Sequence, residues 1–235
     1  LAPDINQSDR EFKVDEGGSI RYGLGAIKGM GERVIDSLLN ERAAHGEFCD
    51  LHSLCRRVDQ YRVTKKVFEA LIMSGSLDCL GSIRAAHWAM LPQTVELVDQ
   101  MAEDQSSGQN DMFGLESSAM VGDLAVSVPD WSSRKALENE RQALGLYLSG
   151  HPIDHVHDEL DALVAGSIAE TRPTPERRIC LAGLGSALRA FNNKRGETAA
   201  FFSLDDGSAC ADVTVSSDLY QSVRNIIETS EILLV

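Results

Sequence analysis

The residues best suited to chemistry lie at 27–34, where the chain reads IKGMGERV. Two glycines around one apolar residue, directly before an expected helix, predict a tight turn whose backbone N–H groups point outward. The positive end of the helix and the side chains of Lys28 and Arg33 add to the attraction for an anion. Lys28, Gly29, Gly31 and Arg33 are therefore candidates to hold a phosphate group through its oxygens.

A second helix, turn and helix follow the first arrangement along the chain. We expect a helix at 65–74 with Thr64 as its N-cap, then a glycine-bounded turn at 75–81 (GSLDCLG) before the next helix. The basic residues at the starts of these two helices are further candidates for phosphate contact: Lys65, Lys66 and Arg84. Each turn alone is also typical of an ordinary loop. The repeated order resembles a pair of helix-hairpin-helix motifs, which would grip a nucleic-acid backbone without reading its bases.

An acidic, polar segment at 103–111 (EDQSSGQND) has the composition of a linker. Two large apolar residues, Met112 and Phe113, follow it directly. A short peptide with a glutamine and two apolar anchors is typical of a docking element, which makes Gln109, Asp111, Met112 and Phe113 candidate binding residues. Alternatively, the two apolar side chains fold back onto helices of this chain, and the pattern alone leaves both interpretations open.

From residue 178 the apolar residues recur with the period of strands instead of helices. Ala200, Phe202 and Leu204 alternate toward a core, which directs Phe201 to the opposite face of the sheet. The residues expected near Phe201 are basic or aromatic: Arg189, Phe191, Lys194 and Arg195. Rings that stack on bases and cations that follow phosphates are typical of a site for single-stranded nucleic acid, although an exposed β-loop has the same composition.

Periodicity and capping residues predict the elements that would position these side chains. The expected helices are 32–44, 50–57, 65–74, 82–103, 133–148 and 218–227, and the expected strands are 12–14, 20–22, 179–188, 198–204, 209–215 and 232–235. Pro92 predicts a break or kink in the fourth helix, and Gly150 and Pro152 predict the end of the fifth. The predicted fold class is multidomain α+β: a mainly helical tandem helix-hairpin-helix domain, then an oligonucleotide-binding (OB) β-barrel without its fifth strand.

The charge of the chain is unevenly distributed. The 235 residues carry a net charge of -14, which by itself argues against general nucleic-acid binding. Residues 54–66, however, hold five basic side chains against Asp59 alone, and residues 172–196 hold six against Glu176 alone. Residues 96–123 hold seven acidic side chains and no Lys or Arg. This segregation predicts that different parts of the chain meet different partners.

Several functional classes are not indicated. No apolar run is long enough to cross a bilayer, and a chain that opens without Met or a signal peptide is typical of a piece of a longer protein. Five cysteines without paired spacing favour a reducing compartment. Length and composition are typical of two or more folded domains.

Neither a metal site nor a catalytic site is expected. His45, Cys49, His52 and Cys55 have spacings that could share one helix face, but Gly46 interrupts that helix, so we expect packed or surface side chains there. Adjacent carboxylates at 205–206 point to opposite faces of a strand and precede a glycine, which predicts a turn.

Three segments, in order, resemble the bacterial DNA polymerase III alpha subunits, the family C replicative polymerases: 22–31 (YGLGAIKGMG), 67–78 (VFEALIMSGSLD) and 140–152 (ERQALGLYLSGHP). The resemblance runs along essentially the whole chain. It implies a DNA-directed DNA polymerase as the parent protein, in the bacterial cytoplasm at the nucleoid. It also implies that the catalytic aspartates and Mg²⁺ belong to the palm, so this portion inherits no catalytic residue or cofactor and is expected to be inactive alone.

The resemblance divides the chain into five parts: the end of the fingers at 1–22, a tandem helix-hairpin-helix domain at 23–104, a clamp-binding linker at 105–116, a helical connector at 117–171 and an OB domain at 172–235. In this family a Gln-x-Asp-Met-Phe motif binds the sliding clamp, and Gln109, Asp111, Met112 and Phe113 match it. The implied partners are duplex and single-stranded DNA, the β sliding clamp and, through the parent, other subunits of the polymerase III holoenzyme.

Two other identities stay open at this point. One is the same region of an error-prone paralogue of this polymerase. The other is a non-enzymatic DNA junction-binding protein, which combines the same two modules with the barrel first, whereas here the hairpins come first.

Overall fold

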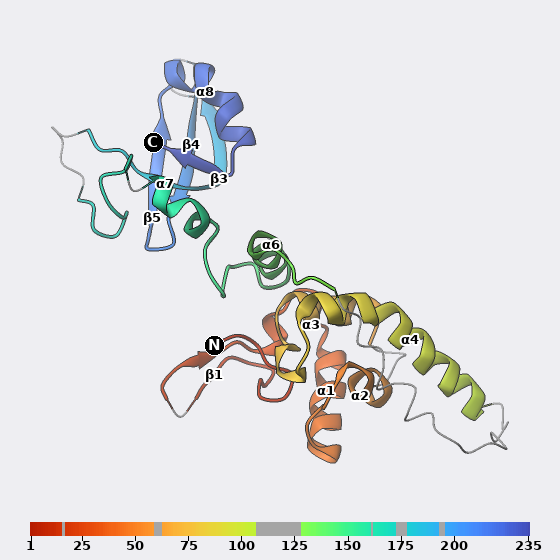
Figure 1. The fold of residues 1–235 in the computed structure, drawn as a ribbon. Coiled ribbons are helices and arrows are strands. Elements are labelled where there is room, and N and C mark those ends of the chain that lie inside the picture. Colours follow the sequence, from red (N-terminus) through yellow and green to blue (C-terminus); the bar gives the residue numbers. More distant parts are fainter. Residues whose placement is uncertain (16, 59–62, 107–127, 161, 173–177, 193–195) are drawn as a thin grey trace. The chain divides into compact units, whose positions relative to one another are not determined.

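The computed structural model describes the chain except for residues 16, 59–62, 107–127, 161, 173–177 and 193–195 (Figure 1). It divides into two compact units, unit 1 (Leu1–Ser149) and unit 2 (Gly150–Val235). The five functional parts expected from the resemblance stay predictions. None of the described helices is both long enough and apolar enough to cross a membrane.

Unit 1 is mainly helical. Its elements in order are β1 (Lys13–Val14), β2 (Ile20–Arg21), the 3₁₀ helix η1 (Leu24–Ala26), α1 (Glu32–His45), α2 (Leu51–Arg57), α3 (Lys65–Met73), the 3₁₀ helix η2 (Asp78–Leu80), α4 (Arg84–Ser106) and α6 (Ser133–Leu144). β1 and β2 form the expected antiparallel hairpin, in which Val14 pairs with Ile20.

The predicted apolar stripes form one core in unit 1. Val34, Ile35 and Leu38 of α1 are buried with Leu71 and Ile72 of α3, because apolar residues three and four apart share a helix face. The Asp50 side chain accepts a hydrogen bond from Ser53 N at 2.6 Å, which confirms the predicted cap of α2.

In unit 1, one predicted alternative and one predicted helix end are corrected by the structure: α4 does not break at Pro92, and α6 ends earlier than expected. α4 is continuous through Pro92, although proline removes one helical hydrogen bond. Leu91 and Val98 are buried in the core on either side of it, so tertiary packing outweighs the local penalty. α6 ends at Leu144 and not at residue 148, because Gly145 adopts the left-handed conformation (φ 85°) that closes a helix.

Unit 2 contains the predicted sheet. Its elements are η3 (Pro152–Val156), α7 (His157–Leu160), β3 (Ala182–Asn192), β4 (Thr198–Asp205), β5 (Cys210–Val215), α8 (Ser217–Thr229) and β6 (Ile232–Leu234). The strands are antiparallel in the order β5-β4-β3-β6, and α8 packs on β4 (Figure 1). The sheet curls into a half-barrel of OB type, which together with the helical unit confirms the predicted α+β fold class.

The alternation predicted for β4 is confirmed. Ala200, Phe202 and Leu204 are fully buried and pack with Val215, Tyr220 and Leu233. Between Ser186 and Arg189 the pairing of β3 with β4 shifts at a bulge, where Ala187 has a φ of 54°. Beyond the bulge Arg189 pairs with Phe201, so the bulge sets which side chains lie beside this ring.

Candidate nucleic-acid interface

The turn at 27–31, here called the first hairpin, has its apolar side chains inward and its glycines outward. Ile27 and Met30 belong to the core of unit 1, and Met30 N donates to Ile27 O at 3.2 Å to close the turn. Gly29 has a φ of 87°, a conformation that side chains rarely adopt. Neither Gly29 nor Gly31 has an atom within 4 Å of the position that a Cβ would take, so the space in front of both is open.

The first hairpin presents backbone donors that the described part of the chain does not use. The N–H groups of Gly29, Gly31, Glu32 and Arg33 donate no hydrogen bond to any described residue, whereas Val34 N and the next amide both donate to Gly31 O. Gly31 is the N-cap of α1, a helix of 14 residues, and its lack of a side chain leaves these donors uncovered. Unpaired donors at the positive end of a helix form a site for an anion.

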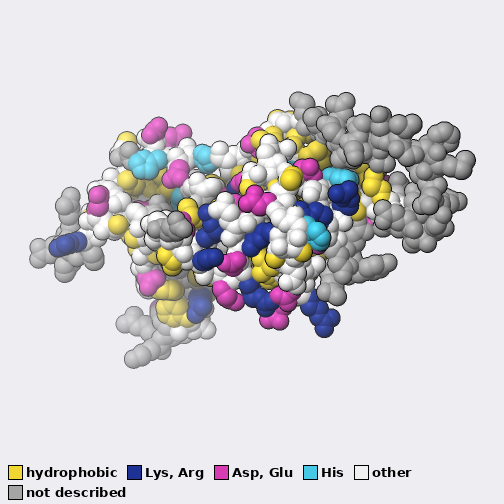
Figure 2. Space-filling model, turned by 90° about the horizontal axis from the view of Figure 1, so that it is seen from below, with side chains coloured by type: hydrophobic (Ala, Val, Ile, Leu, Met, Phe, Trp, Pro, Cys, Tyr) yellow, Lys and Arg dark blue, Asp and Glu magenta, His cyan; other side chains and the backbone are white. Residues whose placement is uncertain are grey.

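The charges beside the first hairpin are mixed. Lys28 and Arg33 are exposed and form no ion pair with a described carboxylate. Glu32 is acidic, so it weakens the attraction of Lys28 and Arg33 for an anion. Its side chain is 87% exposed and lies 4.0 Å from a guanidinium nitrogen of Arg10. On the face that Figure 2 shows, described Lys and Arg side chains lie among Asp and Glu side chains and form no continuous basic surface. At the first hairpin itself, Lys28 and Arg33 supply the positive charge and Glu32 opposes it.

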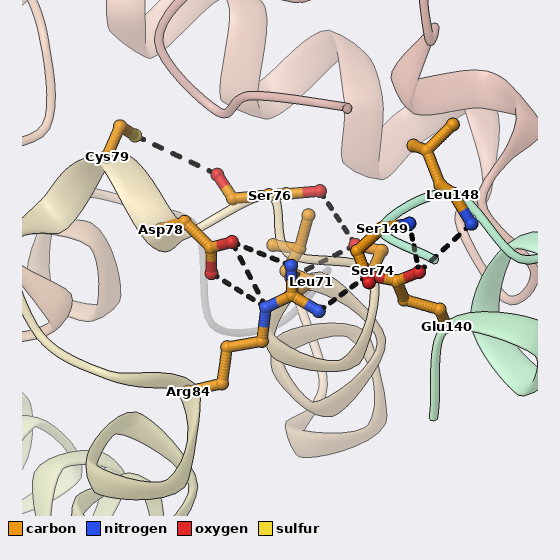
Figure 3. A network of polar contacts seen from close by, with 9 residues as sticks. All are labelled: Leu71, Ser74, Ser76, Asp78, Cys79, Arg84, Glu140, Leu148 and Ser149. Carbon is orange, nitrogen blue, oxygen red and sulfur yellow. Dashed lines mark hydrogen bonds and ion pairs between the residues drawn. The ribbon is translucent and has the colours of Figure 1, made fainter. Parts of the chain in front are cut away.

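The turn at 74–81, here called the second hairpin, pairs several of its backbone N–H groups within the chain. Gly75 N donates to Ile72 O at 3.1 Å, Ser76 N donates to Leu71 O at 3.0 Å, and Asp78 N donates to Gly75 O at 3.1 Å. The hydroxyls of Ser74 and Ser76 lie 2.7 Å apart and are buried (Figure 3). The second hairpin differs from the first in what lies in front of it: the Arg84 side chain covers Gly75, whereas Gly29 and Gly31 face open space.

Arg84 lies over the second hairpin and is held by two carboxylates (Figure 3). Its Nη2 donates to Asp78 Oδ2 at 2.7 Å, and its Nη1 donates to Glu140 Oε1 at 2.9 Å. A Cβ on Gly75 would come within 2.3 Å of Nη2, which shows how closely the guanidinium covers the turn. The predicted phosphate residue Arg84 is thus placed in an internal network, and Asp78 and Glu140 supply the anions there.

Glu140 is the centre of this network and was not singled out from the sequence. Its Oε2 accepts hydrogen bonds from Leu148 N at 3.1 Å and Ser149 N at 3.0 Å. Burial disfavours the charged carboxylate, but the bonds from Arg84 and these two amides outweigh it and hold the pKa of Glu140 below its usual value. The one available signal was its position at the start of the motif at 140–152.

The other two predicted phosphate residues lie at the start of α3. Lys65 and Lys66 are exposed, and Lys65 Nζ lies 4.0 Å from Glu69 Oε1. Both lie in the first turn of the helix, where a cation is disfavoured by the helix dipole. Their contact with DNA stays a prediction.

The predicted single-strand residues lie on the exposed face of the unit 2 sheet. Arg189, Phe201 and Thr214 are neighbours across β3, β4 and β5, and Phe191 is 45% exposed. Phe201 is partly buried, so part of its side chain remains accessible to solvent. Lys194 and Arg195 lie outside the described residues, so the site is only partly seen.

The clamp-binding residues predicted at Gln109, Asp111, Met112 and Phe113 also lie outside the described residues. Nothing in the structure bears on their conformation, so this assignment rests on the sequence.

The described residues contain no group of three or more His, Cys, Asp or Glu arranged to hold a metal ion. In the constellation considered above, His45 Nδ1 lies 2.9 Å from Glu41 Oε1, and burial raises the pKa of the Cys55 thiol to about 12. Asp205 and Asp206 cap the β4–β5 turn, as predicted: they accept hydrogen bonds from Gly207 N and Ser208 N.

Comparison with known proteins agrees with this geometry. Residues 1–87 match the family described as helix-hairpin-helix motif, a stretch that includes both hairpins. The whole chain is 39% identical to the DNA polymerase III subunit alpha of Vibrio cholerae over 238 residues, which cover 20% of that protein. It is 37% identical to that of Escherichia coli K12 and 34% identical to that of Pseudomonas aeruginosa, again over the whole chain and 21% and 22% of those proteins.

The chain therefore spans about a fifth of the length of these curated relatives. The resemblance stated from three motifs is confirmed: along its whole length the chain matches one segment of the DNA polymerase III alpha subunits.

Proposed function

We propose that this chain is a DNA-holding portion of a replicative DNA-directed DNA polymerase, and that the first hairpin grips a backbone phosphate of the template-primer duplex. The observation that carries the proposal is the set of four unused N–H groups at Gly29, Gly31, Glu32 and Arg33, at the start of α1 and in open space. Hydrogen bonds to phosphate oxygens carry no base information, so the grip is independent of sequence and permits sliding.

Two further contacts belong to the proposal. The segment with Gln109, Asp111, Met112 and Phe113 docks on the β sliding clamp, with Met112 and Phe113 as apolar anchors. This tether raises the effective concentration of the polymerase at the primer end. On unit 2, Arg189, Phe191 and Phe201 contact single-stranded DNA through stacking and charge, together with Lys194 and Arg195.

The catalytic step belongs elsewhere in the parent protein. Because the chain spans only about a fifth of its polymerase relatives, we assign nucleotidyl transfer to another part of the parent protein and expect no nucleotide incorporation by this chain alone. Assembly with other holoenzyme subunits, likewise, is a property of the parent, in the bacterial cytoplasm at the nucleoid. The polymerase relatives support this assignment over a junction-binding protein.

The duplex-binding proposal is tested by filling the space in front of the first hairpin. Gly31 has a φ of -80° and no atom within 4 Å of a Cβ position, so Gly31→Ala fits the fold and adds a methyl group where the phosphate would lie. Gly17→Ala is the control, because it adds the same group to the exposed β1–β2 turn.

The readout is fluorescence anisotropy of a labelled duplex of mixed sequence, titrated with the full chain. We expect Gly31→Ala to weaken binding about tenfold and Gly17→Ala to leave it unchanged. Equal affinity of the wild type and both variants would refute the assignment of the first hairpin. Absence of duplex binding by the wild type would refute DNA holding by this chain.

A further inference from the structure

The C-terminal end of α6 is built onto the first hairpin, although the two are far apart in the sequence. Lys28 N donates to Ala143 O at 2.8 Å, and Tyr22 Oη donates to Leu144 O at 3.1 Å. The Lys28 side chain lies along the turn that ends the helix, with Nζ 3.5 Å from the position of a Cβ on Gly145. Any ligand held at the first hairpin therefore lies near the last turn of α6.

One cation on that last turn, Arg141, pairs with no carboxylate in the described part of the chain. Arg141 is exposed and forms no ion pair with a described residue, whereas the neighbouring carboxylates are engaged: Glu138 with Arg134 and Lys135, and Glu140 with Arg84. A guanidinium carries five N–H donors, and the one hydrogen bond found here, from Nη1 to Tyr147 Oη at 3.0 Å, uses a single donor.

The position of Arg141 is fixed by Tyr147. The guanidinium carbon lies 5.5 Å from the centre of the tyrosine ring, and the hydroxyl holds one edge of the group. Gly145 reverses the chain between the two residues, and the amides of Leu148 and Ser149 bind Glu140, which anchors the loop that carries the ring. A guanidinium held in this way loses less conformational freedom when it binds a ligand than a free surface arginine does.

We propose that Arg141 binds a second backbone phosphate of the strand gripped at the first hairpin, with Tyr147 as its positioning residue. Arg141 lies in the last turn of α6, four residues before the C-cap Gly145, which is about one helical turn or 5.4 Å along the axis. Because the Lys28 side chain lies against Gly145, the backbone of Arg141 is about one helical turn from it, and the long arginine side chain can reach a nearby phosphate of the same strand. A planar fork of donors matches phosphate oxygens. This inference rests on the proposed function of the first hairpin.

The test compares two arginines on one face of one helix. Arg134 lies seven residues before Arg141, which is about 10.5 Å farther from the first hairpin along α6, and it pairs with Glu138. Binding of the full chain to a labelled mixed-sequence duplex is measured over a range of salt concentrations for the wild type, Arg141→Gln, Arg134→Gln and the double variant Lys28→Gln with Arg33→Gln.

We expect Arg141→Gln to weaken binding about threefold to tenfold and to make the slope of log K against log salt less negative by about 0.9, the loss of one phosphate contact. Arg134→Gln is expected to change neither quantity. Tyr147→Phe keeps the ring but loses the hydroxyl, so it should weaken binding less than Arg141→Gln and leave the salt slope nearly unchanged.

The outcomes distinguish the role of Arg141 from the proposed function of the first hairpin. If the Lys28 and Arg33 double variant binds more weakly while Arg141→Gln matches Arg134→Gln, the role of Arg141 is refuted and the first hairpin stands. If the double variant binds as the wild type does, or the wild type does not bind, the proposed function fails and the inference fails with it.

Discussion

Arg84 Nη1 donates to Glu140 Oε1 at 2.9 Å, and this ion pair between the start of α4 and the middle of α6 makes the two hairpins unequal. The pair holds Arg84 over the second hairpin, where the guanidinium covers Gly75. Among the described residues, no side chain covers Gly29 or Gly31 of the first hairpin in this way. The repeated motif thus yields one turn that is open in front, and one closed joint that is covered by an internal ion pair.

The closed joint predicts a large loss of stability for Glu140→Gln. The carboxylate is buried, its side chain only 2% exposed, and removal of its charge leaves Arg84 with Asp78 alone. We expect the free energy of unfolding to fall by about 3 kcal/mol, as for other broken buried pairs. Both tryptophans of the chain, Trp88 and Trp131, lie in unit 1, so urea unfolding followed by tryptophan fluorescence reports on this unit.

Glu138→Gln is the control for that measurement. Glu138 lies on the same helix, but its side chain is 50% exposed and its pairs with Arg134 and Lys135 lie in solvent. We expect a change below about 0.5 kcal/mol. Equal losses for Glu138→Gln and Glu140→Gln would show that the network in Figure 3 adds little to stability.

The stabilisation that the Glu140–Arg84 ion pair provides should be lost at low pH. Burial raises the pKa of Glu140, but the bonds from Arg84 and the amides of Ser149 and Leu148 lower it further, to below the usual value of 4.5. Because the pKa is lower in the folded state, the stabilisation is complete well above pH 4.5 and is lost as the pH falls through the folded-state pKa.

The difference in unfolding free energy between the wild type and Glu140→Gln should therefore be constant from about pH 7 to about pH 5.5 and shrink below about pH 4.5. The measurement is urea unfolding at each pH. A difference that stays constant down to about pH 3 would mean that ionisation of Glu140 does not carry the effect.

The clamp-binding segment predicts a separation of two binding activities. Met112→Ala combined with Phe113→Ala removes both apolar anchors, so binding to an immobilised β sliding clamp should be lost while duplex affinity is unchanged. Met120→Ala, in the same part of the chain, is the control and should bind the clamp normally. A parallel loss of clamp and duplex binding in the double variant would argue against distinct sites.

The sequence was sufficient to predict those structural features that depend only on residues close together in the chain. Asp50 as a cap, the burial of Phe202 and Leu204, and the turn at Gly207 follow from preferences that act over a few residues. The break considered at Pro92 does not occur, because the packing of Leu91 and Val98, a long-range effect, holds the helix through it.

The interface was predictable only in part, for the same reason. The glycines of the first hairpin carry their own conformational signal, so their placement could be predicted. Arg84 carried the same charge as Arg33, and nothing within its own helix showed that Glu140 would pair with it. The bulge at Ala187, which brings Arg189 opposite Phe201, likewise depends on pairing between strands.

The most direct test of the central claim is to observe the backbone amides of the first hairpin in solution. On an isotope-labelled full chain, addition of a mixed-sequence duplex should shift the N–H resonances of Gly29 and Gly31, and added salt should reverse the shifts. Gly75, whose N–H is bonded to Ile72 O in the second hairpin, should not move. DNA binding that leaves Gly29 and Gly31 unshifted, or that shifts Gly75 as much, would contradict the account.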